Sequence, residues 1–167
     1  FSGEPATVTL HALAVIDAHR RYGILTAPKH FPGHGSAAGD THEGFVDVTG
    51  RWSAVELEPF QSLIRQGKAD MIMTAHIFNG KLDPAWPATL SARTLNGLLR
   101  QEMGFEGVVS SDDLQMKAIA ARYGLETVIR QAILAGVDIL LFANNSVYEE
   151  DIAARAAETI RALVEKG

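Results

Sequence analysis

The stretch GVVSSDDLQM (residues 107–116) carries the pattern that decides the fold: a short apolar run that ends directly in Ser111, Asp112 and Asp113. An apolar run of this length, opened by a glycine and closed by polar residues, predicts a buried β-strand. Further stretches repeat the same order of apolar residues followed by polar ones. They are 24–28 before Lys29 and His30, 70–75 before His76, and 137–143 before Asn144 and Asn145.

Stretches with helical spacing of apolar residues surround these predicted strands. They cover 5–22, 53–66, 91–104, 114–135 with a break near Tyr123 and Gly124, and 147–165. Ser53 and Glu56 have the spacing of a capping box at the start of the second helix. Strands separated by helices run parallel, and their crossovers are right-handed. The sequence therefore predicts an α/β fold built from parallel βα units.

The polar residues at the strand ends are the candidates for function. The carboxyl ends of parallel strands meet at one edge of a sheet or barrel, where binding sites are built. The long loop 30–50 adds further histidines to this edge. A dinucleotide site is not indicated, because GHGSAAG (33–39) follows a proline inside this loop and not a strand.

Composition narrows the function classes. The chain has 167 residues, 47% of them hydrophobic and 21% charged, which suits about one domain. Its net charge of −5 argues against a nucleic acid partner, and the absence of cysteine excludes disulfides and a thiol nucleophile. The most apolar run, 137–143, is far shorter than the ~20 residues that span a membrane. FSGEPATV (1–8) lacks the features of a signal peptide, and the compartment stays open.

His30 and His34 are four residues apart, the spacing of metal ligands on a helix. Pro32, Gly33 and Gly35 disfavour a helix here, so we favour a loop-structuring role for His34 and keep a zinc site as the alternative. His11 and His19 fall within a helical pattern and are interpreted as ordinary helix residues.

Asp40 and His42 are two residues apart, so in an extended or turn segment their side chains point the same way. A carboxylate beside an imidazole fixes its tautomer and favours its protonated form, which makes a proton-transfer pair near neutral pH. An Asx-turn with a solvated histidine is the alternative that the spacing leaves open.

Asp112 and Asp113 follow a strand directly, so only one of them can point into a pocket at its end. The other is suited to cap the following helix. A nucleophilic carboxylate must stay ionised, and a nearby cation such as Lys29 helps, although Lys29 is equally interpreted as a solvated surface amine.

KHFPGHG (29–35), DTH (40–42) and SDDLQM (111–116) together resemble glycoside hydrolase family 3, and within it the bacterial β-N-acetylhexosaminidase branch. ELEPFQSLI, ADMIMTAHI and GFEGVV are also similar to that family, so the resemblance covers nearly the whole chain.

This resemblance implies retaining hydrolysis of β-linked N-acetylglucosaminides on a (β/α)8 barrel, a carbohydrate substrate and a link to peptidoglycan recycling. It implies that Asp112 is the nucleophile and that Asp40 and His42 form an acid/base dyad on a mobile loop. Lys29 and His30 match residues that hold sugar hydroxyls, and His76 matches a further histidine of the substrate site. No cofactor and no metal are expected. Asp113 occupies a variable family position and is expected to cap a helix.

The barrel of this family needs eight strands and about 250 residues, whereas the patterns here correspond to its second half. Residues 1–167 are thus expected to be a partial catalytic barrel domain, whose activity in isolation is open. The resemblance also places an Arg and an Asp that bind the sugar upstream of Phe1. Open strand edges favour pairing either with the remaining half of the barrel or with a second copy in a homodimer.

Further alternatives stay open at this point. A metal-dependent hydrolase on a barrel would use His30, His34, His42 and Asp112. A half-barrel with no catalytic role is another interpretation of the same pattern. Within the glycosidase hypothesis the acceptor is either water or phosphate, because a histidine acid/base lacks the negative charge that repels phosphate.

Overall fold

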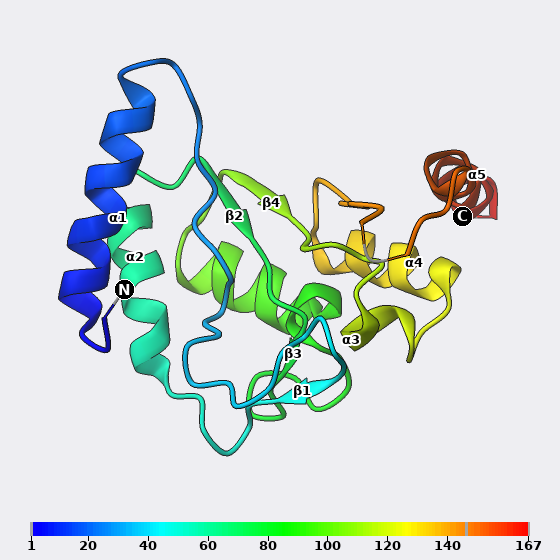
Figure 1. Cartoon of the computed structure of the whole chain (residues 1–167), viewed down its shortest axis with the longest axis horizontal. Helices are drawn as coiled ribbons and strands as arrows, with labels where there is room; N and C mark the ends of the chain where they lie inside the picture. The colour runs from blue at the N-terminus through cyan, green and yellow to red at the C-terminus, as the bar shows by residue number, and fades with distance from the viewer. Residues whose placement is uncertain (1, 146, 167) are drawn as a thin grey trace.

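Helices and short strands alternate along the chain, as Figure 1 shows. The computed structural model describes residues 2–145 and 147–166. Phe1 lies outside the described residues, and so do the Arg and the Asp expected upstream of it. The helical elements are α1 (Pro5–Arg20), η1 (Ala54–Leu57), α2 (Glu58–Arg65), η2 (Ala88–Leu90), η3 (Arg93–Glu102), α3 (Lys117–Ala120), α4 (Leu125–Ala135) and α5 (Ile152–Lys166). The strands are β1 (Val46–Asp47), β2 (Met71–Met73), β3 (Ile77–Phe78) and β4 (Val108–Ser110).

The strands pair in parallel, which confirms the predicted α/β class. β2 pairs with β4 and β1 pairs with β3. Single parallel bridges extend the β2–β4 pair on both sides, from Phe31 to Thr74 and from Ser110 to Ile139. The predicted strand segments thus lie side by side in the order in which they occur in the chain.

The two outer segments, 24–28 and 137–143, do not form strands, and the prediction that they do is wrong in this respect: 137–143 has a single bridge at Ile139, and the bridge on the other side lies beyond 24–28, at Phe31. Pro28 has no N–H, and its carbonyl only accepts the Met73 N–H at 3.1 Å. On the other side, the Asp138 carboxylate accepts the Val109 N–H at 2.8 Å, in place of a backbone partner. Each outer segment therefore lacks a continuous ladder of backbone hydrogen bonds.

The predicted capping box is also wrong. Ser53 makes no side-chain cap, and the chain enters α2 through the 3₁₀ turn η1. The Glu56 carboxylate instead accepts hydrogen bonds from the Gly35 N–H and the Ser36 hydroxyl in the preceding loop. The last helix begins at Ile152, several residues after its predicted start, whereas the break at Gly124 between α3 and α4 is confirmed.

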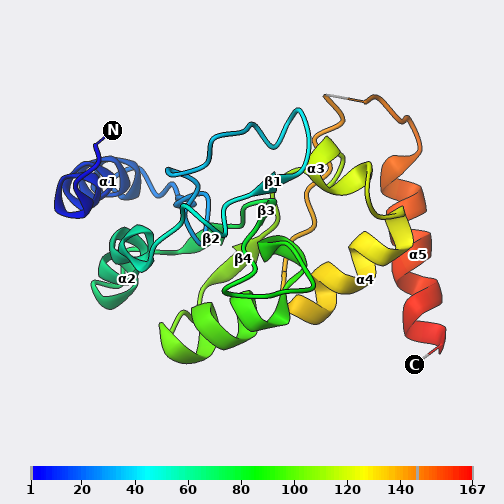
Figure 2. The ribbon, with the colours of Figure 1, turned by 90° about the horizontal axis from the view of Figure 1, so that it is seen from below.

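Two apolar clusters hold these elements together. The larger one packs the faces of η3 and α4 against β2 and β4, with Ile72, Leu95, Leu99, Val109 and Ala132 fully buried. The smaller one lies under β1 and β3 around Val48, Trp52 and Ile77. In Figure 2, α1 with α2 and α4 with α5 occupy opposite ends of the molecule, and the strands lie between them. Packing of these clusters holds the strands in place, and with them the residues at the carboxyl ends of the strands.

Among the described residues, no helix combines the length and the apolar character needed to cross a bilayer.

Candidate functional site

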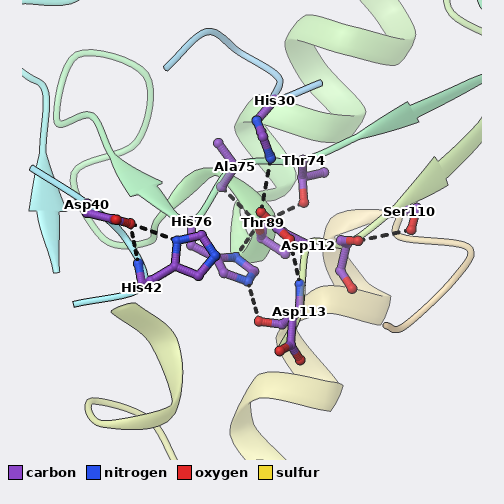
Figure 3. A network of polar contacts seen from close by, with 11 residues as sticks. His30, Asp40, His42, Thr74, Ala75, His76, Thr89, Ser110, Asp112 and Asp113 are labelled. Carbon is purple, nitrogen blue, oxygen red and sulfur yellow. Dashed lines mark hydrogen bonds and ion pairs between the residues drawn. The ribbon is translucent and has the colours of Figure 1, made fainter. Parts of the chain in front are cut away.

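The carboxylate of Asp112 lies just beyond the end of β4, where it is held from two sides. Its Oδ1 accepts the backbone N–H of Asp113 at 2.8 Å. Its Oδ2 lies 3.3 Å from Nε2 of His30, which directly precedes Phe31, the residue that bridges to Thr74. The Asp112 side chain keeps 17% of its surface exposed, so a molecule at this edge can still reach it. Figure 3 shows both contacts.

The pKa of His30 is shifted by burial and by several charged neighbours. Partial burial lowers its pKa most strongly, and the carboxylate of Asp112 opposes this shift. The charges of Lys29, His34 and His42 add smaller effects that lower the pKa further. The 3.3 Å contact between His30 and Asp112 is therefore what links this segment to the end of β4.

Asp40 and His42 form the pair that their spacing suggests. Oδ1 of Asp40 accepts both the backbone N–H of His42 at 2.8 Å and its ring Nδ1 at 2.7 Å. The Asx-turn and the carboxylate–imidazole contact therefore occur together. These hydrogen bonds hold the pKa of Asp40 below its usual range. A carboxylate on Nδ1 leaves Nε2 of His42 as the nitrogen that can exchange a proton with a ligand.

The loop that carries this dyad is attached to the segment after Asp112. The Thr41 carbonyl accepts the Ala118 N–H of α3 at 3.3 Å. The ring centroid of Phe45 lies 5.5 Å from that of Phe78 and 4.5 Å from the guanidinium carbon of Arg122. The dyad and Asp112 are thus carried by two segments in direct contact.

The first part of the same loop is attached to η1. Gly33 has φ +115°, and a Cβ at this position would lie 2.5 Å from Cβ of Glu56. The Glu56 carboxylate receives the Gly35 N–H at 3.0 Å, which orders the turn after His34. The Lys29–His30 and Phe31–Pro32 peptide bonds, just before this turn, are cis.

His76 is buried, with 1% of its surface exposed. Its Nδ1 lies 2.8 Å from Oγ1 of Thr89, and its Nε2 lies 2.8 Å from the carbonyl oxygen of Asp113. Both ring nitrogens are therefore engaged inside the protein. The expectation that Asp113 caps a helix is wrong, because α3 begins only at Lys117. Oδ1 of Asp113 accepts instead the N–H groups of Gln115 and Ala143.

Lys29 and His34 are the remaining predicted residues. Together with His30 they line one end of a cleft of about 580 Å³ that continues between α1 and α2. The rings of His30 and His34 meet edge to face with their centroids 6.1 Å apart. Within residues 2–145 and 147–166, no set of three His, Asp or Glu side chains converges as metal ligands. The alternative metal site from His30, His34, His42 and Asp112 therefore has no ligand cluster.

Sequence reasoning missed several residues that support the site. Thr89 lies in the short η2 turn after Pro87 and belongs to no sequence motif, yet its hydroxyl contacts His76. Glu56 was visible only as half of a capping box, and Arg122 and Phe45 were unremarkable members of a helix and a loop. Each acts through a contact between segments distant in sequence, and such contacts leave no local pattern.

The chain is similar in sequence to a known protein family and to curated relatives. The sequence profile of the Glycosyl hydrolase family 3 N terminal domain matches residues 1–167. A Beta-hexosaminidase of Tolumonas auensis is 40% identical over 148 residues, which cover 87% of this chain and 44% of the relative. The chain thus spans less than half the length of this curated relative.

Solved structures have the same fold. A glycoside hydrolase family 3 beta-N-acetylglucosaminidase from Paenibacillus sp. str. FPU-7 superposes with a TM-score of 0.83 at 35% identity, over 91% of this chain and 29% of that one. A Beta-N-acetylhexosaminidase from Beutenbergia cavernae gives a TM-score of 0.85 at 30% identity, over 98% of this chain and 46% of that one.

Proposed function

Because the chain belongs to glycosyl hydrolase family 3, we propose that it supplies the nucleophile and the acid/base dyad of a retaining β-N-acetylhexosaminidase. The reaction is hydrolysis of the O-glycosyl bond of β-linked N-acetylglucosaminides. The names of the relatives support this reaction class. Residues 1–167 are then part of a catalytic barrel domain, and the rest of the sugar subsite comes from the remaining half.

The observation that carries the proposal is the partly exposed carboxylate of Asp112 at the end of β4, oriented by the Asp113 N–H and facing His30. In the first step, this carboxylate attacks the anomeric carbon while the bond to the leaving oxygen breaks. His42 donates its Nε2 proton to that oxygen. Water then attacks the same carbon, passes a proton to His42 and releases Asp112, with net retention of configuration.

Asp40 and His42 are suited to the proton transfers because Asp40 holds Nδ1 and leaves Nε2 free. Lys29 and His30 are proposed to bind sugar hydroxyls, since His30 lies 3.3 Å from Asp112 and Lys29 directly precedes His30 in the chain. The exposed side chains of Asp40 and His42, 58% and 69%, are consistent with a loop that closes over bound substrate.

The nucleophile is tested by trapping. The full protein is incubated with a fluorinated N-acetylglucosaminyl fluoride, which forms the glycosyl-enzyme faster than water releases it, and the labelled peptide is mapped by mass spectrometry. We expect the label on Asp112 and none in Asp112→Asn. Asp151→Asn, the same change at an exposed carboxylate, is the control and should label as the wild type does. A label elsewhere, or none in the wild type, contradicts the proposal.

The acid is tested by varying the leaving group. We expect His42→Ala to slow poor leaving groups by about 10²–10⁴-fold and activated aryl leaving groups much less. Equal losses for both classes would contradict the acid role. Following the product as free sugar or sugar phosphate, while phosphate is varied, decides between water and phosphate as the acceptor.

A further inference from the structure

His76 belongs to a buried polar network that lies behind Asp112. It is the third residue after the end of β2 and has no exposed face through which a ligand could reach its ring. Oγ1 of Thr89 lies 2.8 Å from Nδ1 of His76, 2.8 Å from Oγ1 of Thr74 and 2.9 Å from the Ala75 carbonyl oxygen. The Nδ1 side of the His76 ring therefore contacts the Thr89 hydroxyl, which is itself fixed by Thr74 and the Ala75 carbonyl.

The other side of the ring contacts the segment that carries Asp112. Nε2 of His76 lies 2.8 Å from the carbonyl oxygen of Asp113. A carbonyl oxygen only accepts hydrogen bonds, so Nε2 carries the proton in this contact. His76 is thus a donor to the main chain at the position directly after Asp112.

Asp113 transmits this contact to the carboxylate. While its carbonyl oxygen accepts from His76, its N–H donates to Oδ1 of Asp112 at 2.8 Å. The other oxygen of Asp112 faces His30. Figure 3 shows the continuous path from Thr89 through His76 and the main chain of residue 113 to Asp112.

We propose that His76 is a positioning residue that acts through the main chain of Asp113 to aim the Asp112 carboxylate, and that it does not contact the sugar. The inference rests on the proposed role of Asp112 as the nucleophile. Its physical basis is that attack on the anomeric carbon requires an oriented carboxylate, and a displacement of about 1 Å costs on the order of 10²-fold in rate.

The test compares His76→Leu, which removes the donor at similar volume, with His76→Gln, whose amide N–H can reach the same carbonyl. Measured in the full protein are the rate of labelling at Asp112 by the fluorinated sugar and the inhibition constant of N-acetylglucosamine. We expect His76→Leu to slow labelling by about 10²-fold, with the inhibition constant changed less than about threefold, and His76→Gln to recover most of the rate. His19→Leu, at an exposed position of α1, is the matched control.

Two results overturn the inference. If the inhibition constant rises by the same factor as the labelling rate falls, His76 contacts the sugar. If only the melting temperature changes, its role is structural. Should His76→Leu fail to fold, Thr89→Val and His76→Gln carry the test with the same two readouts, and unchanged labelling in Thr89→Val counts against the inference. Absence of label in the wild type instead contradicts the proposed function itself.

Discussion

The contact between His30 and Asp112 joins residues from two βα units, and its electrostatics can be measured. Burial lowers the pKa of His30, and the negative charge of Asp112 is the main effect that opposes this. The protonation of His30 therefore reports on how close the carboxylate lies.

Asp112→Asn removes the opposing charge, so we expect the pKa of His30 to fall further below its usual range. An NMR titration of the His30 ring protons measures it. Asp151→Asn, an equal change of charge at an exposed site far along the chain, should leave the titration as it is in the wild type. A His30 pKa that does not move in Asp112→Asn would show that the two groups are apart in solution.

Buried histidines also make stability depend on pH. Burial is the largest cause that lowers the pKa of both His30 and His76. Below about pH 6.5 the unfolded chain therefore binds more protons at these residues than the folded one, and the free energy of unfolding falls as pH falls. For one buried histidine the slope is at most about 1.4 kcal/mol per pH unit.

Urea unfolding at pH 7.5 and 5.5 checks this sign. We expect a lower free energy of unfolding at pH 5.5, and a smaller difference between the two pH values in His76→Gln, which removes one of the groups. The lowered pKa values of Asp17, Asp40 and Asp47 act only near and below about pH 4 and do not contribute in this window. Stability that is independent of pH between 5.5 and 7.5 would contradict the prediction.

Local spacing predicted some of these residues and not others. Asp40 and His42 are two positions apart, and a single turn was enough to bring them together. One of the two aspartates after the strand was expected to cap the next helix, and the family resemblance pointed to Asp113. Its carboxylate instead accepts the Ala143 N–H from the neighbouring outer segment, a partner that local sequence cannot indicate.

At the scale of elements, the turn 33–36 depends on its contact with η1. Gly33 has positive φ, and its Cα faces the side chain of Glu56. This close approach explains why glycine occupies the position, since any side chain would meet both backbone strain and a clash.

We expect Gly33→Ala to lower the free energy of unfolding by about 2–4 kcal/mol, from the positive φ and from the 2.5 Å contact with Cβ of Glu56. Gly50→Ala is the matched control, because no atom lies within 4 Å of a Cβ there, and it should cost less than about 1 kcal/mol. Urea unfolding of both variants makes the comparison. Equal stability of the two variants would mean that the turn does not pack on Glu56.

The dyad loop shows the same dependence on neighbours. Arg122 covers Phe45, and Phe45 lies against Phe78, so the loop is attached to the segment beyond α3 and to β3. The sequence marked the loop as long and polar. Its attachment points became visible only when the segments were packed together.

At the scale of the whole molecule, the parallel array has two open edges. Segment 24–28 forms one of them, and Ile24 and Leu25 there are 52% and 70% exposed. Segment 137–143 forms the other, with Ile139 at 43%. Exposed apolar side chains beside unpaired strand-like backbone favour pairing with another chain segment.

We therefore expect residues 1–167, expressed alone, to associate with a second copy at concentrations of tens of micromolar, whereas a longer protein would cover this edge with its remaining half. Sedimentation velocity measures the association, and the double variant Ile24→Thr, Leu25→Lys should weaken it. Val164→Lys, at an exposed apolar position of α5, is the control. A compact monomer of the unmodified chain would contradict the prediction.

The sequence by itself determined the α/β class and the parallel direction of the segments, and it pointed to the edge where the candidates Asp112, Asp40 and His42 were expected. These follow from apolar periodicity, from glycine and proline, and from short motifs, all of which are local in the chain. Only the tertiary structure decided that Glu56 serves a loop and not a helix cap, that the outer segments do not become full strands, and that His76 is enclosed between Thr89 and the main chain of Asp113. Such partners are distant in sequence, and burial and the need to satisfy each buried polar group select them once the elements pack.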